Sequence, residues 1–315
     1  MMNLEAEYRN GYFVSAEMKK VWAVQIELLN KLLEVCNKHN LQIWAEGGTL
    51  LGTVRHNGFI PWDDDIDVVM LREDYDKLVQ IAPEEFDHPY FFQCGYTEKL
   101  YPRGHAQLRM DGTTAILPYP AFVDTHQGIF IDIFVLDAVP DNDDEMRRQI
   151  MERNAMFDKM QHVFPFDPLH LFRSLSLLRY RRNFVDLFGR YEELFKRYRV
   201  EDNEFVSLHS FLVDFDRFLR KKQWYNETIQ MPFEDIMLPV PIGYNEILSK
   251  QYGDYMSPKK SPSNHGGFWK LDAETPYSDY LPDLKKFYRR NKWRSYIRRI
   301  NNLVKKVFNN AKGQG

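Results

Sequence analysis

Apolar positions recur at intervals of three to four along residues 17–39, with Glu and Lys between them. This spacing is typical of an amphipathic helix, and Asn40 is a suitable stop for it. The next five residues, LQIWA, predict a short strand that enters a turn at Gly47-Gly48. The pattern therefore predicts a helix, a strand and a glycine turn in succession.

Two apolar runs further along predict buried strands. The first, DIDVVML, is followed by a helical pattern in REDYDKLVQIA. The second, GIFIDIFVLDAV, is apolar apart from Asp132 and Asp137. We expect Asp132 to lie within this strand and Asp137 to form a turn or cap at its end.

After Pro140 the sequence becomes more charged and aromatic. Residues 141–222 predict two or more helices, interrupted by the turn FPFDP. The segment that starts at Met231 returns to strand, loop and short helix. These patterns predict an α+β fold with a helical insertion over about residues 141–222.

Composition narrows the class of protein. Of 315 residues, 44% are apolar and 28% are charged, which is ordinary for a globular chain. The first residues lack the apolar core of a signal peptide, and no later run reaches the ~20 apolar residues of a membrane span. Cys36 and Cys94 match no metal-ligand spacing. We expect a cytoplasmic protein with reduced cysteines.

Charge is divided unevenly along the chain. From Lys285 onward there are eleven Lys or Arg residues and no acid, so the preceding part has 31 basic and 45 acidic residues, a balance of −14. Between Trp293 and Val307 the spacing of apolar residues predicts a basic amphipathic helix. Such a helix suits an anionic membrane surface, or it packs its apolar stripe on the rest of the protein. Nucleic acid is not expected, because a negative body repels phosphates.

The stretch GGTLLGTVRHNGFIPWDDDIDVVM has four aspartates within residues 63–67. Residues two apart in a strand share a face, so Asp65 and Asp67 point the same way. Two such charges ~4 Å apart repel by ~4 kcal/mol at an effective dielectric near 20, and a divalent cation removes the repulsion. Oxygen ligands favour Mg²⁺ or Mn²⁺. Asp63 and Asp64 follow Pro61-Trp62 and are equally explained as turn residues.

A site for two ions needs a third carboxylate, and Asp132 supplies one if its strand lies beside DIDVV. Two ions can clamp the attacking and leaving oxygens of an in-line displacement at phosphorus. Backbone N–H groups of the Gly47-Gly48-Thr49 turn can approach phosphate oxygens closely, and Arg55 adds a fork-shaped donor suited to phosphate. The alternatives for these residues are an ordinary turn and a surface ion pair.

These motifs resemble the LicD family of phosphocholine and related phosphotransferases, relatives of fukutin-type proteins in the nucleotidyltransferase superfamily. GGTLLGTVRHNGFIPWDDDIDVVM is similar to the family signature almost throughout, and GIFIDIFVLD is similar to its second acidic strand. FEDIMLPVPIGYNEILSKQYGDYMSPKKSPSNHGG resembles its C-terminal block. The resemblance runs from about residue 21 to residue 267 and is weakest over 141–222.

The resemblance implies a nucleotidyltransferase-like catalytic domain over residues 1–284, built on a small mixed β-sheet flanked by helices, and a basic tail over 285–315. It implies that Asp65, Asp67 and Asp132 are the catalytic and metal-binding residues, holding two Mg²⁺ or Mn²⁺ ions. The implied reaction is the transfer of phosphocholine from CDP-choline to a hydroxyl of a cell-surface glycan or its lipid-linked precursor. No zinc is expected, because the chain lacks the cysteine cluster of some relatives.

Other candidate substrate contacts lie outside the acidic motifs. The family often has paired histidines in its last block. This chain has Asn264-His265, so any shared role falls on His265, whose alternative is a solvated loop residue. Arg109, in HAQLRMDGTT, is a candidate to neutralise donor phosphate or an ordinary ion-pair residue. Aromatic residues near the motifs could surround a quaternary ammonium or simply form core; they are Trp62, Tyr119, Phe122 and Trp269.

The sequence as a whole predicts a metal-dependent phosphotransferase that uses a nucleotide-activated donor and a glycan acceptor, peripheral to an anionic membrane. One rival is a glycosyltransferase that reads Asp65-Ile66-Asp67 as a DxD sugar-nucleotide motif. The other is a non-catalytic relative that binds glycan or membrane. Loss of an acid would mark that relative, and all three acids are present here.

Overall fold

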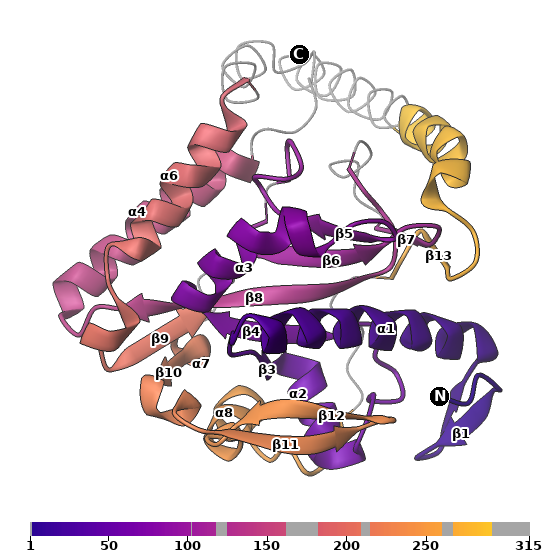
Figure 1. Cartoon of the computed structure of the whole chain (residues 1–315), viewed down its shortest axis with the longest axis horizontal. Coiled ribbons are helices and arrows are strands. Elements are labelled where there is room, and N and C mark those ends of the chain that lie inside the picture. The colour runs from indigo at the N-terminus through magenta and orange to yellow at the C-terminus, as the bar shows by residue number, and fades with distance from the viewer. Residues whose placement is uncertain are drawn as a thin grey trace, which may run out of the picture.

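A seven-stranded mixed sheet forms the centre of the molecule, with helices packed around it (Figure 1). The structure is a computed structural model, and it describes residues 2–101, 103–117, 125–161, 182–208, 215–259 and 267–291. The strand order is β10-β9-β8-β4-β3, with β6 paired to both β8 and β5. The strands are β3 (Trp44–Ala45), β4 (Asp67–Leu71), β5 (Tyr90–Gln93), β6 (Ala106–Met110), β8 (Phe130–Val139), β9 (Phe205–Leu208) and β10 (Leu219–Lys221). The predicted α+β class with a mixed sheet is confirmed.

Strand β8 is the longest strand of this sheet, and all ten of its residues are buried. It pairs in parallel with β4 and antiparallel with β6 and β9. Asp137 lies inside the strand and is 2% exposed, so the prediction of a turn or cap at this residue is wrong. The strand continues through Ala138 and Val139 because these residues pair with β9.

The helices predicted from apolar spacing on either side of the acidic stretch are present. Helix α1 spans Ala16–Lys38, and Oγ of Ser15 accepts a hydrogen bond from the N–H of Met18 at its start. Asn40 follows its end with a φ of 53°, as a stop residue should. Helix α3 spans Arg72–Glu85 directly after β4. Both helices pack on the sheet, where α1 contacts β6 and β8 and α3 contacts β4 and β8.

The glycine pair lies in a helix and not in the predicted turn. Helix α2 spans Gly47–His56, with Glu46 at its N-cap position. Leu50 and Leu51 of this helix are buried in the core, and that burial keeps the segment helical despite its glycines. The prediction of a turn is therefore corrected to a helix N-terminus.

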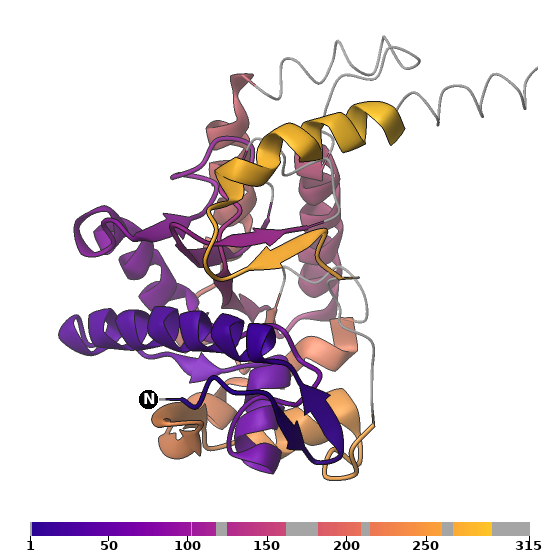
Figure 2. The same cartoon turned by 90° about the vertical axis from the view of Figure 1, so that its right-hand side faces the viewer.

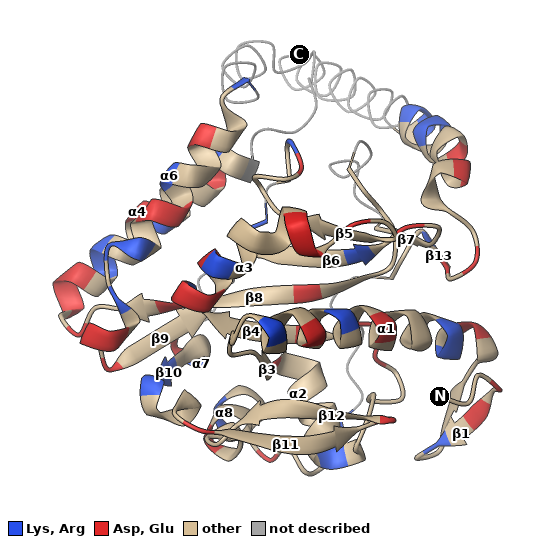
Figure 3. Ribbon diagram, in the orientation of Figure 1, with Lys and Arg blue, Asp and Glu red and all other residues tan. Residues whose placement is uncertain are grey.

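The segment predicted as a helical insertion is only partly helical. Helices α4 (Asp143–Gln161) and α6 (Phe184–Lys196) pack on each other at one end of the sheet and enclose a small apolar cluster of their own (Figure 1). Lys, Arg, Asp and Glu are spread along both helices (Figure 3). Strands β9 and β10 fall within the same segment, yet they extend the main sheet. The long helices of this segment thus end before β9, and only the short helix α7 (Phe215–Phe218) follows it among the described residues.

Three small two-stranded sheets and two further helices complete the described fold. Sheet β11–β12 and helix α8 lie beside α2, below the main sheet in Figure 1. The bounds of these elements are β1 (Glu7–Arg9), β2 (Tyr12–Val14), β7 (Thr114–Ile116), α7 (Phe215–Phe218), β11 (Thr228–Phe233), β12 (Ile236–Pro241), α8 (Tyr244–Tyr252) and β13 (Lys270–Asp272). Short 3₁₀ turns occur at Val200–Asp202 and Lys222–Tyr225.

A helix over residues 277–291 begins the basic segment and lies above β13 in Figure 2. Leu284 is fully buried, the hydroxyl of Tyr288 donates to the carbonyl of Leu117 (3.4 Å), and Phe287 packs against Trp269. This first part of the basic segment therefore packs on the body. The predicted stripe from Trp293 to Val307 lies outside the described residues. In the described part of the chain, no helix combines the length and apolar character needed to cross a membrane.

Candidate active site

The N-terminus of α2 brings two glycines against the acidic stretch. Gly47 has a φ of 52°, a conformation that residues with a Cβ atom adopt only with strain. A Cβ atom on Gly47 would lie 3.0 Å from Oδ2 of Asp67, and one on Gly48 would lie 2.5 Å from Oδ2 of Asp63. The first N–H groups of a helix have no partner within the helix. The glycines therefore let an anionic group come close to these donors.

Both backbone polar groups of Asp67 are hydrogen-bonded. Its N–H donates to Oγ1 of Thr49 (2.8 Å), and its carbonyl accepts from the N–H of Glu46 (3.0 Å). The parallel pairing of β4 with β8 sets Asp67 opposite Asp132, and residues paired in this way project on the same face of the sheet. The predicted pairing of the two acidic strands is confirmed, and Thr49 positions Asp67.

Helix α1 holds the loop that carries the other aspartates. Nε1 of Trp22 donates to the carbonyl of Asp63 (3.1 Å), and Nε2 of Gln25 donates to the carbonyl of Asp64 (2.9 Å). One carboxylate oxygen from each of Asp63, Asp64 and Asp65 lies within 4.8 Å of the other two. This is a spacing at which three carboxylates can share one ion.

The structure brings together more aspartates than the sequence predicted. Sequence reasoning selected Asp65, Asp67 and Asp132 and left the two preceding aspartates as equally good turn residues. The structure instead gathers Asp63 and Asp64 around Asp65, while Asp67 and Asp132 are close enough to act on the same charges. The five aspartates therefore form one acidic cluster at the edge of α2.

Burial and mutual repulsion raise the pKa values in this acidic cluster. The pKa of Asp65 rises to about 7, first because the carboxyl is buried and then because of the charges of Asp64 and Asp132. Burial, followed by the charge of Asp65, also holds the pKa values of Asp63 and Asp67 well above the ordinary value. A divalent cation would relieve this repulsion. Carboxylate oxygens without a thiolate suit Mg²⁺ or Mn²⁺ better than zinc.

Asp132 is held by side chains beside it that sequence reasoning missed. Nε2 of Gln107 donates to Oδ1 of Asp132 (2.6 Å), and Nε2 of His105 lies 3.1 Å from the same oxygen. Arg109 donates through Nη2 to Oε1 of Gln107 (2.5 Å) and through Nη1 to the carbonyl of Gly128 (2.7 Å). Arg109 is therefore buried behind the cluster and reaches it through Gln107. The sequence signal that could have found them is the alternation of polar residues in HAQLR, at His105, Gln107 and Arg109.

A buried ion pair supports the start of α2 from behind. Arg220 on β10 donates through Nη1 and Nη2 to the two carboxylate oxygens of Glu46, both at 2.6 Å. Nε2 of Gln251 on α8 donates to Oε1 of Glu46 (3.1 Å), and Arg220 also contacts the hydroxyl of Tyr225 (2.5 Å). The pair joins residues 174 positions apart in sequence, so no local sequence pattern predicted it.

Comparison with known proteins places this site in a family. Residues 40–176 match the family described as LicD/FKTN/FKRP, nucleotidyltransferase domain. The matched range contains α2, the acidic loop, β4 and β8, and therefore all five aspartates of the cluster. This part of the chain is therefore similar to the LicD family. The resemblance stated from the sequence motifs is confirmed.

Relatives of this chain include proteins that are named as phosphotransferases. It is 27% identical over 252 residues to the lipopolysaccharide cholinephosphotransferase LicD of Haemophilus influenzae, which covers 74% of this chain and 89% of that protein. It is 36% identical over 59 residues to the human and mouse ribitol 5-phosphate transferase FKRP, which covers 19% of this chain and 12% of each relative. It is also 30% identical over 143 residues to the uncharacterized protein RP689 of Rickettsia prowazekii, or 45% of this chain and 50% of that protein. The predicted enzyme class of the family, phosphotransferase, agrees with these names.

The remaining predicted contacts lie at different distances from the acidic cluster. Arg55 lies in the last turn of α2, about two turns from the glycines, and its Nη1 donates to the carbonyl of Tyr255 (2.6 Å). Trp62 directly precedes the acidic cluster and stands edge-on to Tyr12, with ring centroids 5.9 Å apart. Trp62 is thus beside the cluster, whereas Arg55 is farther along the helix.

Trp269 lies just after Gly267, where the described part of the chain resumes. It packs against Phe287 of the helix at 277–291, with ring centroids 6.1 Å apart. Three predicted contacts, Tyr119, Phe122 and His265, lie outside the described residues.

Proposed function

We propose that this chain transfers phosphocholine from CDP-choline to a hydroxyl group of a glycan or of its lipid-linked precursor, with Mg²⁺ or Mn²⁺ as cofactor. The observation that carries this proposal is the similarity to a lipopolysaccharide cholinephosphotransferase along most of both chains. The acidic cluster beside the N-terminus of α2 supports it, because a diphosphate donor needs both a cation and N–H donors.

Each part of the site has a role in this reaction. Mg²⁺ or Mn²⁺ held by Asp63, Asp64 and Asp65, with Asp67 and Asp132 beside them, would neutralise charge on the donor diphosphate. The first N–H groups of α2 bind phosphate oxygens next to the cluster. Hydrogen bonds from α1 and β6 hold the carboxylates in place before the substrate arrives.

The chemical step is a displacement at the phosphorus that bears the choline. The acceptor oxygen forms the new P–O bond, and the bond between this phosphorus and the bridging oxygen of the diphosphate breaks. Cytidine monophosphate leaves with the electron pair of that bond. A carboxylate of the cluster takes the proton of the acceptor hydroxyl, which balances the charge on the new phosphodiester.

The choline group has no hydrogen-bond donor and keeps its charge at every pH. Recognition therefore depends on aromatic faces and shape, whereas ribitol needs polar partners for its hydroxyl groups. Trp62 and Tyr12 beside the cluster offer such faces. With Mg²⁺ present, CDP-choline should raise the thermal midpoint more than CDP-ribitol or CDP-glycerol at equal concentration. A larger shift with a polyol donor would contradict phosphocholine as the transferred group. It would not contradict the proposal of phosphotransfer.

The decisive test is product analysis by mass spectrometry. The purified chain is incubated with Mg²⁺, each of a panel of CDP- and UDP-activated donors, and glycans from the source organism. We expect a new phosphodiester that carries choline, and none from the Asp67→Asn variant. A transferred sugar would overturn the proposal in favour of the glycosyltransferase reading of Asp65-Ile66-Asp67.

A further inference from the structure

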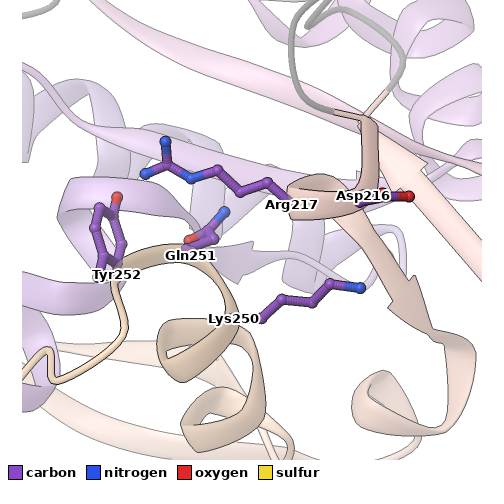
Figure 4. Close-up of a pocket in the computed structure, with 5 residues that line it drawn as sticks. All are labelled: Asp216, Arg217, Lys250, Gln251 and Tyr252. Carbon is purple, nitrogen blue, oxygen red and sulfur yellow. The ribbon is translucent and has the colours of Figure 1, made fainter.

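A pocket of about 600 Å³ lies between α7 and α8, and its described lining residues belong to these two helices (Figure 4). Arg217 and Lys250 give it two positive charges against one negative charge. The size is in the range of sites that hold a small molecule. The lining residues are Asp216, Arg217, Lys250, Gln251 and Tyr252.

The pocket adjoins the acidic cluster through Tyr252. The hydroxyl of Tyr252 and Oδ2 of Asp67 lie 3.9 and 3.0 Å from the same point, the position that a Cβ atom on Gly47 would occupy. Burial, followed by the charges of Glu46 and Asp67, raises the pKa of Tyr252 far above neutrality, so this hydroxyl is a donor. A molecule that reaches from the cluster into the pocket therefore passes a phenol donor.

Two polar groups of the pocket are left without partners. Nε of Arg217 is buried and has no hydrogen-bond partner in the described part of the chain. Gln251 is only 8% exposed, and its Nε2 is committed to Glu46 at 3.1 Å, which leaves Oε1 buried without a donor among the described residues. Buried polar groups without partners are costly, and a ligand is one way to satisfy them.

The two cations of the pocket are not equivalent. Nζ of Lys250 donates to the carbonyl of Leu219 at 2.5 Å, so its position is set by the protein. The guanidinium of Arg217 instead lies over the ring of Tyr252, 5.6 Å from its centroid, and both side chains occupy the same end of the pocket in Figure 4. Arg217 is thus the cation of the pocket that is nearest to the tyrosine shared with the cluster.

From these contacts we infer that the pocket binds the nucleoside monophosphate half of the donor, with Arg217 on its phosphate and Oε1 of Gln251 accepting an N–H or O–H group of the nucleoside. The inference rests on the proposed function, because it names the leaving group of that reaction. A planar guanidinium suits a phosphate that gains charge as the P–O bond breaks. A glycan acceptor reacts through a neutral hydroxyl and gives no comparable reason for a cation here.

The test is calorimetric titration of the full chain with cytidine monophosphate in the presence of Mg²⁺. Removal of a charge-assisted hydrogen bond should weaken binding by about ten- to a hundredfold in Arg217→Met, and Arg217→Lys should retain part of the affinity. Arg190→Met is the matched control, because the Arg190 side chain on α6 is 71% exposed and, within the described part of the chain, pairs locally with Asp186. Unchanged affinity in Arg217→Met, with the wild type binding, would overturn the inference.

Inhibition kinetics and inorganic phosphate separate the remaining outcomes. Cytidine monophosphate should inhibit transfer in competition with the donor, and Arg217→Met should lose this inhibition. Phosphate that binds as tightly as the nucleotide would show a simple anion site and contradict the nucleoside part. If transfer occurs but Arg217→Met leaves inhibition unchanged, the inference fails and the proposed function stands. If the nucleotide binds through Arg217 and no donor yields a phosphodiester, the pocket stands and the proposed function fails.

Discussion

Strand β8 has an aspartate toward each end, and the two ends differ in their surroundings. At Asp137, Nε and Nη2 of Arg72 donate to the two carboxylate oxygens at 2.6 and 3.0 Å, and Nη1 donates to Glu192 at 3.1 Å. At Asp132, Gln107 and His105 contact one oxygen, and the charge of Asp132 helps to raise the pKa values of Asp65 and Asp67.

The two ends are equally buried, since Asp132 is 3% and Asp137 is 2% exposed. Burial alone therefore does not separate a structural carboxylate from a functional one. At one end the protein supplies the cation itself and uses it to join α3, β8 and α6. At the other end the acids raise one another's pKa values, and a divalent cation would relieve this repulsion. The two ends therefore differ in the charges around the aspartate and not in its depth.

The largest effect on turnover should come from substitutions in the acidic cluster near Asp132. Asp65→Asn or Asp67→Asn should reduce transfer by at least about a thousandfold, or ~4 kcal/mol in the activation barrier, and weaken Mn²⁺ binding. The folded state should remain, because the change removes a repelling charge. Turnover, Mn²⁺ calorimetry and urea denaturation measure these three effects. Unchanged Mn²⁺ affinity in both variants would rule out the proposed metal site.

Substitution of Arg72, which pairs with Asp137, should lower the stability of the fold. Arg72→Met leaves two buried carboxylates without their cation and should lower the free energy of unfolding by about 3–5 kcal/mol. Urea denaturation measures this loss. The control adds Asp137→Leu and Glu192→Leu to the same chain, which removes the unpaired charges and should recover much of the stability. An unchanged urea midpoint in Arg72→Met would mean that this network does not stabilise the fold.

Gly48→Ala tests how closely the acidic cluster fits α2. The new Cβ atom would meet Oδ2 of Asp63 at 2.5 Å and displace that carboxylate, so turnover should fall by about ten- to a hundredfold. Gly189→Ala on α6 is the control, because the one described atom that its Cβ would meet within 4 Å is the hydroxyl oxygen of Tyr96, at 3.8 Å. Helix propensity favours alanine there by about 0.5–1 kcal/mol. Equal turnover in the two variants would contradict a close fit at Gly48.

A smaller effect should follow from removal of the basic residues after 291. The preceding helix is anchored by Leu284, so truncation at 291 should leave the fold and the turnover on a soluble acceptor unchanged. Binding to anionic liposomes should fall by at least about tenfold, because ~1 kcal/mol from each of two of the seven removed Lys or Arg residues already exceeds that factor. Flotation with vesicles of stated anionic content measures this. Precipitation of the truncated chain would instead assign the stripe to packing on the body.

The sequence was sufficient where a local pattern decided the structure. Helix α1 and strands β4 and β8 followed from apolar spacing, and the pairing of Asp67 with Asp132 followed from two acids in two apolar runs. The resemblance to the LicD family followed from the motif around the aspartates, and the family model matches residues 40–176. These features share short-range causes that a single segment contains.

The failures have long-range causes. Asp137 was expected at a turn because its cation, Arg72, lies 65 residues earlier and looks like an ordinary first residue of a charged helix. The glycine pair was expected to form a turn because the buried contacts that keep α2 helical come from distant segments. Nothing near Glu46 indicated Arg220, or that Gln251 and Tyr252 would extend the site.

The parallel register of β4 against β8 limits how this gene can change. Loss of a single codon within either strand would shift its remaining side chains to the opposite face, sending a carboxylate into the apolar layer and an aliphatic residue to the cluster. A pair of adjacent codons could be lost with the alternation kept. In a library of deletions across β4, one-residue variants should therefore be depleted more strongly than two-residue variants.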